Sequence, residues 1–252
     1  MSVYKKILKN KSANRKMLAV LIDPDNNTSG SFAKIAKSCQ EAKVDIILAG
    51  GSLITTNNFD KCIEEIRSNC DIPVMLFPGG VMQISIKADG ILLLSLISGR
   101  NPDMLIGKHV ETASIIRKSG LESIPTGYIL VDGGKITSVQ YISNTIPIPA
   151  DKNDIAVSTA IAGEMLGMKL IYLEAGSGAI NPVPLKMITA VSNEIALPLC
   201  VGGGIRTPES AIAICKAGAN IIVIGNAFEK NYQLIGEISC AIHELSTEHH
   251  NS

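Results

Sequence analysis

The fold is decided by a stretch in the last third of the chain, Tyr172-Leu173-Glu174-Ala175-Gly176-Ser177-Gly178-Ala179. An apolar run ends there in one carboxylate, and small residues follow at once. Because strand side chains alternate, Leu170, Tyr172 and Glu174 are expected on one face, with Leu173 on the other. The glycines can adopt positive φ and leave backbone N–H groups uncovered, which suits the close approach of an anion. We therefore expect a strand that carries Glu174 to a ligand pocket.

The same pattern recurs in two later segments. An apolar run leads into Gly202-Gly203-Gly204-Ile205-Arg206, and another leads into Gly225-Asn226. After the first, Thr207 and Pro208 read as the N-cap and first position of a helix. Glycine loops after late strands form the recurring phosphate site of (β/α)8 barrels. The alternative is that these glycines only make tight turns between strands and helices.

Strand and helix patterns alternate along the whole chain. Eight apolar runs of strand length lie at residues 17–22, 45–49, 73–77, 90–94, 128–131, 169–173, 197–201 and 221–224. Helical patterns lie at residues 32–42, 59–69, 102–119, 155–166, 184–193, 209–217 and 231–245. Such alternation implies parallel βαβ units, and eight of them favour a single (β/α)8 TIM barrel over an open sheet.

Three local features modify this plan. Val3 and Ile7, and Tyr4 and Leu8, are spaced for a short amphipathic N-terminal helix that could plug the bottom of the barrel. The segment 77–90 is too short and glycine-rich for a regular helix, so the third crossover is expected to be irregular. Residues 128–131 and 136–139 flank Asp132-Gly133-Gly134-Lys135, which predicts a hairpin.

Length and composition indicate one globular domain over residues 1–252. The chain has 252 residues, of which 46% are hydrophobic, and no linker composition divides it. Lys plus Arg equals Asp plus Glu, 23 against 23, so there is no net field for nucleic acid. The six cysteines are expected to be small buried hydrophobes. The N-terminus lacks the pattern of a signal peptide, which predicts a cytoplasmic protein, and peripheral membrane contact stays allowed.

The first two strand ends carry oxygen ligands. Asp23 follows the first apolar run, within Asp23-Pro24-Asp25, and Ser52 follows the second, within Gly50-Gly51-Ser52. A carboxylate and a hydroxyl on adjacent loops suit magnesium, which keeps several waters and also uses phosphate oxygens of a substrate. Taken by itself, Asp-Pro-Asp after a strand is more often a plain turn than a metal site. The histidines, His109, His243, His249 and His250, have no spacing that indicates a zinc site or a triad.

Together these motifs resemble the geranylgeranylglyceryl phosphate synthase family, including its PcrB-type bacterial relatives. The resemblance runs in order over residues 17–229, and its most specific parts are Leu21-Ile22-Asp23-Pro24-Asp25 and the Y-L-E-x-G-S-G element at 172–178. The resemblance implies a prenyltransferase that joins the C3 hydroxyl of sn-glycerol 1-phosphate to a polyprenyl diphosphate, of which the geranylgeranyl form is expected. An ether forms and diphosphate leaves. The resemblance also implies a homo-oligomer.

The resemblance assigns roles to particular residues. Asp23 and Ser52 would hold Mg²⁺, and Glu174 would orient or deprotonate the attacking hydroxyl with help from Tyr172. The residues implied to bind glycerol 1-phosphate are Tyr172, Leu173, Glu174, Ala175, Gly176, Ser177, Gly178, Gly203, Gly204, Gly225 and Asn226. For Tyr172, a ring that only fills the barrel is an equally good reading.

One departure from the family leaves a gap. Some members place a lysine close to the first-strand aspartate, but here its neighbours are Leu21, Ile22 and Asn26. A basic contact for the diphosphate must come from elsewhere, and Arg100, Lys135 and Arg206 are the candidates. Residues 77–97 are expected to supply one wall of an apolar trough for the prenyl chain. The rival functions are a phosphosugar isomerase and a non-catalytic phosphate-binding barrel.

Overall fold

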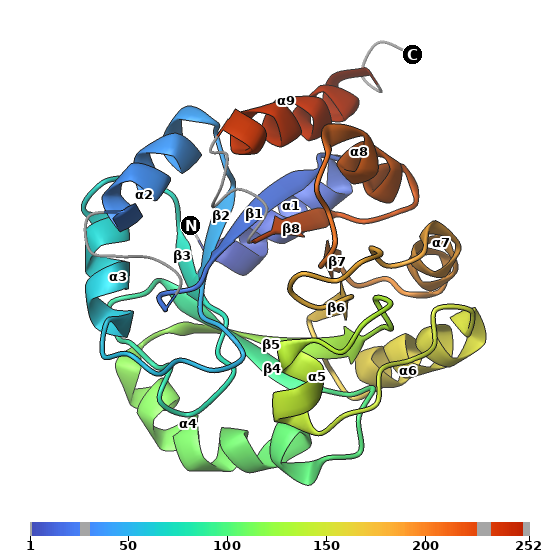
Figure 1. Cartoon of the computed structure of the whole chain (residues 1–252), viewed down its shortest axis with the longest axis horizontal. Coiled ribbons are helices and arrows are strands. Elements are labelled where there is room, and N and C mark those ends of the chain that lie inside the picture. The colour runs from blue at the N-terminus through green and yellow to red at the C-terminus, as the bar shows by residue number, and fades with distance from the viewer. Residues whose placement is uncertain (1, 26–30, 226–232, 249–252) are drawn as a thin grey trace.

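Eight parallel strands close into a barrel in chain order, as the computed structural model shows (Figure 1). The structure describes residues 2–25, 31–225 and 233–248. The strands are β1 (Met17–Ile22), β2 (Ile46–Ala49), β3 (Val74–Leu76), β4 (Gly90–Leu96), β5 (Glu122–Leu130), β6 (Leu170–Glu174), β7 (Leu199–Gly202) and β8 (Ile221–Ile224). Val20 of β1 aligns with Ile47 of β2 on one side and with Ile224 of β8 on the other, which closes the barrel. The predicted (β/α)8 fold is confirmed.

Most of the helices surround the barrel, whereas α1 (Val3–Ser12) lies behind it in this view (Figure 1). The others are α2 (Ser31–Glu41), α3 (Phe59–Arg67), the π-helix η1 (Asp103–Gly107), α4 (Lys108–Ser119), α5 (Ser138–Ser143), α6 (Asn153–Met165), α7 (Leu185–Glu194), α8 (Pro208–Lys216) and α9 (Gln233–Glu248). Thr207 caps α8 by accepting from the Ser210 N–H at 3.2 Å, and Pro208 follows at the first position, as predicted. No helix among the described residues is long and apolar enough to cross a membrane.

Alternation along the strands produces two cores. Leu170 and Tyr172 of β6 pack inside the barrel, whereas Ile171 and Leu173 pack in the layer between the sheet and the helices. Because the parallel strands are covered on both faces, they read as continuous apolar runs. The predicted face of β6 is therefore confirmed.

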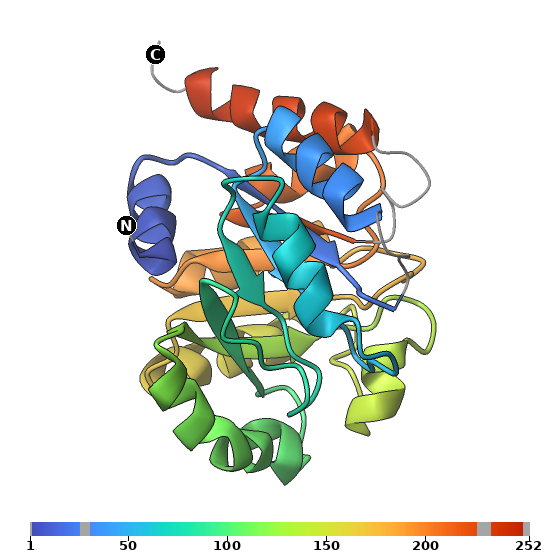
Figure 2. The same cartoon turned by 90° about the vertical axis from the view of Figure 1, so that its left-hand side faces the viewer.

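The N-terminal helix closes one end of the barrel. Val3 and Ile7 of α1 join the inner core, and Figure 2 shows α1 at the end opposite to α5. The Glu122 carboxylate at the start of β5 accepts from the Ser2 hydroxyl at 2.5 Å and from the N–H groups of Val3 at 2.7 Å and Tyr4 at 2.9 Å. A carboxylate at a helix N-terminus satisfies donors that the helix itself leaves unpaired. The predicted plug is confirmed.

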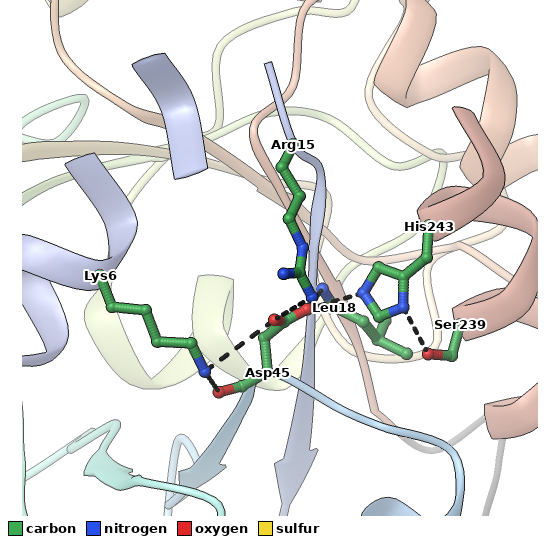
Figure 3. A network of polar contacts seen from close by, with 6 residues as sticks. All are labelled: Lys6, Arg15, Leu18, Asp45, Ser239 and His243. Carbon is green, nitrogen blue, oxygen red and sulfur yellow. Dashed lines mark hydrogen bonds and ion pairs between the residues drawn. The ribbon is translucent and has the colours of Figure 1, made fainter. Parts of the chain in front are cut away.

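A polar network at the same end ties the termini of the chain to the sheet (Figure 3). Asp45, 3% exposed, accepts from the Leu18 N–H at 3.1 Å and lies 2.9 Å from Nε2 of His243 on α9. Lys6 of α1 donates to the Asp45 carbonyl at 3.0 Å, and Arg15 lies 3.8 Å from the carboxylate. One buried carboxylate thus connects α1, β1, β2 and α9.

Two connections depart from a regular barrel. Residues 77–89, all of them described, form turns and no helix, so the irregular third crossover is confirmed. The predicted hairpin after β5 is wrong, because Val131 pairs in parallel with Ile148 and residues 138–143 form α5. The Gly133 carbonyl accepts instead from the N–H groups of Ile180 at 2.9 Å and Asn181 at 3.0 Å in the β6–α7 connection. A Cβ at Gly133 would lie 2.6 Å from the Ala175 carbonyl oxygen, so glycine serves close packing there and not a hairpin turn.

The cysteines are all free, but they are not all buried. Cys39, Cys62, Cys200 and Cys215 are core residues, as predicted. Cys70 is half-buried and Cys240 is exposed on α9, which corrects the expectation for these two.

Candidate active site

The predicted site residues gather at the carboxyl ends of the strands. Asp23 follows β1, Ser52 follows β2, Glu174 ends β6 and Gly202 ends β7. Because all the strands are parallel in one closed barrel, these positions share one rim, where barrel enzymes place their chemistry. Asn226 lies outside the described residues. Gly225, at the end of β8, is half-buried beside Leu21.

The two late glycine loops form a cradle in direct contact. Gly176, Gly178, Gly203 and Gly204 have φ values of +95°, +70°, +83° and +72°, a region that other residues adopt only with strain. A Cβ at Gly203 would lie 2.7 Å from the Gly176 nitrogen and 2.9 Å from the Ala175 nitrogen. Both of these N–H groups already donate within the site, the Gly176 N–H to Glu174 and the Ala175 N–H to the Gly202 carbonyl, so it is the concave turn of positive-φ glycines that is suited to an anion.

Not every predicted binding residue turns its side chain to this cradle. Ser177 and Gly178 are exposed at the loop tip, where they are accessible to a ligand. The side chains of Leu173 and Ala175 belong to the outer core, so only their backbone can contribute. The Ala175 N–H donates to the Gly202 carbonyl at 3.1 Å, which joins the loops after β6 and β7.

Glu174 is the one strongly perturbed carboxylate on the described part of this rim. It is 6% exposed, and its Oε1 accepts from the Gly176 N–H at 2.6 Å. Burial raises the pKa of Glu174 to about 7, against the opposing effects of the Gly176 N–H and the nearby Tyr172 hydroxyl. A carboxyl group with a pKa near neutrality is matched to general acid–base work.

Tyr172 combines both of the readings that the sequence left open. Its ring fills the barrel, with centroids 5.5 Å from Phe77 and 5.2 Å from Tyr128. Its buried hydroxyl lacks a hydrogen bond of good geometry to any described residue, and a Cβ at Gly202 would overlap it. Burial and the nearby Glu174 carboxylate both raise the pKa of this hydroxyl, which therefore stays protonated beside Glu174.

Two of the three basic residues suggested by sequence lie beside the loop after β6, and the third, Arg100, binds a carbonyl in another loop. Arg206 donates to the carbonyls of Ala179 and Ile180 and so braces the loop after β6. Arg100 donates to the Gly99 carbonyl at 2.8 Å. Nζ of Lys135 lies 3.3 Å from where a Cβ at Gly178 would sit, which places this cation over the glycine cradle.

Asp23 and the Gly51–Ser52 turn are packed together. A Cβ at Gly51 would lie 2.9 Å from Oδ2 of Asp23, and the Asp25 N–H donates to Oδ1 at 3.0 Å. Burial raises the pKa of Asp23, which the Asp25 N–H partly opposes. A divalent cation would favour the ionised form, and two oxygen ligands leave room for the waters and phosphate oxygens that Mg²⁺ prefers. The donor set therefore fits magnesium, although no group of three or more His, Cys, Asp or Glu side chains suited to a metal occurs among the described residues.

Gln83 is a buried site residue that sequence analysis missed. Its Oε1 accepts from the N–H groups of Gly51 at 3.2 Å and Gly79 at 3.1 Å, and its Nε2 donates to the Gly51 carbonyl at 2.8 Å. The side chain thus fixes the Gly51 peptide, and with it the neighbouring Ser52. The only sequence feature that could have indicated its role is that Gln83 is a polar side chain within the glycine-rich irregular segment.

An apolar cleft leads away from Ser52. It encloses about 840 Å³, counting the space at its open mouth, between the 77–84 segment and α4. Its walls include Leu96 and Tyr128 of the inner core together with Ile91, Leu93 and Ile116 of the outer core. The predicted wall from residues 77–97 is present. Lys108 and His109 of α4, which sequence analysis did not assign to the site, also line it.

Comparisons with known proteins agree with this geometry. The family model described as the PcrB family matches residues 9–242. The geranylgeranylglyceryl phosphate synthase of Chitinophaga pinensis is 53% identical over 241 residues, 96% of each chain, and that of Pyrococcus horikoshii is 42% identical over 89% of this chain and 88% of its own. The crystal structure of (S)-3-O-geranylgeranylglyceryl phosphate synthase from Thermoplasma acidophilum in complex with substrate sn-glycerol-1-phosphate superposes with a TM-score of 0.92. It has 35% identity and covers 97% of this chain and 99% of its own. The chain belongs to the PcrB family.

Proposed function

We propose that this chain is a geranylgeranylglyceryl phosphate synthase, a prenyltransferase that joins sn-glycerol 1-phosphate to a polyprenyl diphosphate. The observation that carries the proposal is the combination of two unlike compartments on one rim. A glycine cradle beside Glu174 suits a small phosphorylated alcohol, and an apolar cleft running to Ser52 suits a prenyl chain. The synthases to which the chain is similar, and the glycerol phosphate bound in one of them, support this assignment.

Residues of the chain bind glycerol 1-phosphate and accept the proton of its hydroxyl. The glycine loops bind the phosphate of glycerol 1-phosphate through backbone amides, with Lys135 above them, and so turn the C3 hydroxyl toward Glu174. The hydroxyl oxygen then forms a bond to C1 of the prenyl group while its proton passes to the Glu174 carboxylate. The bond from C1 to the diphosphate oxygen breaks, and diphosphate leaves with the electron pair.

Mg²⁺ is part of the proposal. Asp23 and Ser52 would hold it, and when bound it supplies a Lewis acid that stabilises negative charge on the leaving diphosphate. Asp25 helps to keep these loops together, since its carboxylate accepts from the hydroxyls of Thr55 at 2.8 Å and Thr56 at 2.6 Å and from their N–H groups. The loops after β1 and β2 are thereby joined at Asp25 as well as at Asp23, which packs against Gly51.

One incubation separates this function from its rivals. Purified protein is given Mg²⁺, sn-glycerol 1-phosphate and prenyl diphosphates of several lengths, and the lipid product and released diphosphate are identified. An ether lipid with stoichiometric diphosphate is expected, and Glu174→Gln is the matched control. A non-catalytic barrel would bind glycerol 1-phosphate without releasing diphosphate, and an isomerase would consume a phosphosugar supplied instead. Either result contradicts the proposal.

Assembly and membrane contact are proposed on the exposed apolar side chains. Tyr141, Ile146 and Met82 are 80%, 86% and 88% exposed, and Val110 is 70% exposed on α4. Large apolar side chains that are this exposed would lose contact with water on meeting a partner or a lipid layer. We expect a homo-oligomer, to be measured by light scattering after gel filtration, and peripheral binding to lipid vesicles, to be measured by sedimentation.

A further inference from the structure

We propose that Lys108 binds the diphosphate of the prenyl substrate. The inference rests on the proposed function, because it presumes a prenyl diphosphate in the apolar cleft. Among the described residues that line the cleft, Lys108 is the only lysine or arginine and Asp103 the only acidic residue, and the rest of the lining is mostly apolar. A prenyl diphosphate needs this division, with a long apolar wall and positive charge at one end.

The position of Lys108 at the Ser52 end of the cleft follows from its contacts. Its Nζ donates to the Gly79 carbonyl at 2.8 Å. Gly79 in turn packs on the turn after β2, since a Cβ there would lie 2.7 Å from the Ser52 carbonyl oxygen and 2.8 Å from the Ser52 Cα. Gly79 therefore lies between the Lys108 ammonium group and Ser52, the residue proposed to hold Mg²⁺. A diphosphate bound to that Mg²⁺ would lie at this end of the cleft.

The start of α4, which carries Lys108, is held in a fixed position against β4. The π-helix Asp103–Gly107 runs directly into α4, and a π-turn shifts the register of the side chains that follow, which is why such turns are frequent at functional sites. Nε2 of His109 lies 2.8 Å from the Leu94 carbonyl, and the Ser95 hydroxyl donates to the Leu105 carbonyl at 3.1 Å. These contacts fix the start of α4 against β4.

Lys108 also retains capacity to bind an anion. A lysine ammonium has three donors, and the Gly79 carbonyl uses one of them. No ion pair joins Lys108 to another side chain in the described ranges. Arg100 and Arg206 donate to backbone carbonyls in other loops and do not line the cleft. An ammonium group held by a carbonyl at the Ser52 end of an apolar cleft is a point charge suited to phosphate oxygens.

The test measures binding of inorganic pyrophosphate to Lys108→Met by calorimetry at constant Mg²⁺. Methionine keeps the length of the side chain and removes the charge. We expect affinity to fall about 10- to 100-fold, the range that one charge-assisted hydrogen bond supplies, and Lys108→Arg to recover part of it. Lys118→Met, at the exposed end of the same helix, should bind like wild type.

Further readouts separate binding from support of the fold. Glycerol 1-phosphate affinity should stay unchanged in Lys108→Met, and the loss in kcat/KM should be equal for short and long prenyl diphosphates. The thermal midpoint should fall only slightly, since the variant loses the one hydrogen bond to the Gly79 carbonyl. Wild-type pyrophosphate affinity in Lys108→Met, or no pyrophosphate binding by wild type, would overturn the inference. A wild type that binds pyrophosphate through Lys108 but makes no ether lipid would instead refute the proposed function.

Discussion

Glu174 is buried at the end of β6 beside the glycine cradle, and it is the residue that we propose as the general base. Replacing it with glutamine keeps its size and its hydrogen bond from Gly176 but removes the proton acceptor. We expect Glu174→Gln to lower kcat by about 10² to 10⁴-fold, the usual contribution of a general base. Glycerol 1-phosphate affinity measured by calorimetry should change little. Near-normal turnover would remove Glu174 from this role.

The raised pKa of Glu174 also predicts the pH dependence of the reaction. Because burial raises the pKa of Glu174 to about 7, the active carboxylate is lost as pH falls through that value. The rate constant kcat/KM should therefore fall about tenfold per pH unit below pH 7 and level off above it. The pH profile of wild type, compared with that of Glu174→Gln, measures this.

The same shift has a consequence for stability with a definite sign. A carboxyl group whose pKa is raised on folding favours the folded state when protonated. This contribution is present at low pH and is lost as pH rises through about 7. Glu174→Gln should thus unfold at higher urea concentration than wild type at pH 8, with the difference disappearing toward pH 4. A pH-independent difference would contradict the assigned pKa.

Asp23 carries the prediction for the metal. Burial raises its pKa, and removing its charge should remove the reason for a cation to bind beside Ser52. We expect Asp23→Asn to lose activity together with the heat of Mg²⁺ binding measured by calorimetry, whereas exposed Asp151→Asn keeps both. A fully active Asp23→Asn enzyme that still requires Mg²⁺ would refute the metal assignment.

At this scale, sequence reasoning succeeded where a side chain is set by its own strand. Alternation along one strand places Tyr172 and Glu174 inward, and this needs no knowledge of other elements. Lys108 and Gln83 could not be found in this way, because each acts through the Gly51 or Gly79 peptide of a different loop. Their positions depend on a π-turn and an irregular crossover, neither of which has a periodic pattern.

The glycine cradle is a property of whole loops, and Gly203→Ala tests it. Gly203 and Gly120 have φ of +83° and +74°, so alanine at either position costs about 1–2 kcal/mol of backbone strain. A Cβ meets the Gly176 nitrogen at position 203 but nothing within 4 Å at position 120. Glycerol 1-phosphate affinity should therefore fall in Gly203→Ala only, and chemical denaturation should show the larger loss of stability there. Equal affinities in the two variants would argue against the cradle.

Prediction of elements from sequence was sound for strands and weaker for connections. Strands β1 and β8 have the predicted bounds, but β5 begins at Glu122, six residues before the predicted start at 128. Polar Glu122 and Pro125 interrupt the apolar pattern there. Glu122 caps α1, and Pro125 uses only its carbonyl, which accepts from the Lys169 N–H at 2.7 Å. The hairpin prediction was wrong for a similar reason, since the glycines at 133–134 pack against the connection between β6 and α7 and do not form a turn between two strands.

For the molecule as a whole, the Asp45 network joins both ends of the chain to the barrel. Asp45→Ala leaves the Leu18 N–H and His243 without their hydrogen-bond partner, and leaving a buried donor unsatisfied costs about 1–3 kcal/mol. Urea denaturation should show this loss, while KM values stay near wild type because the network lies at the end opposite to the active site. Asp151→Asn, at an exposed position, should unfold like wild type.

The crossover without a helix has a consequence for what becomes of the product. A regular barrel has a helix after each strand, but residues 77–89 form no helix between β3 and β4. The cleft lies at this flank of the barrel, and its walls belong partly to the inner core and partly to the outer core. On the proposed function, a hydrocarbon tail would lie along this flank, in contact with both cores. A tail longer than the cleft would emerge at the flank, where a lipid layer could receive it while the polar head is still bound. An oily product could then be handed over without crossing water.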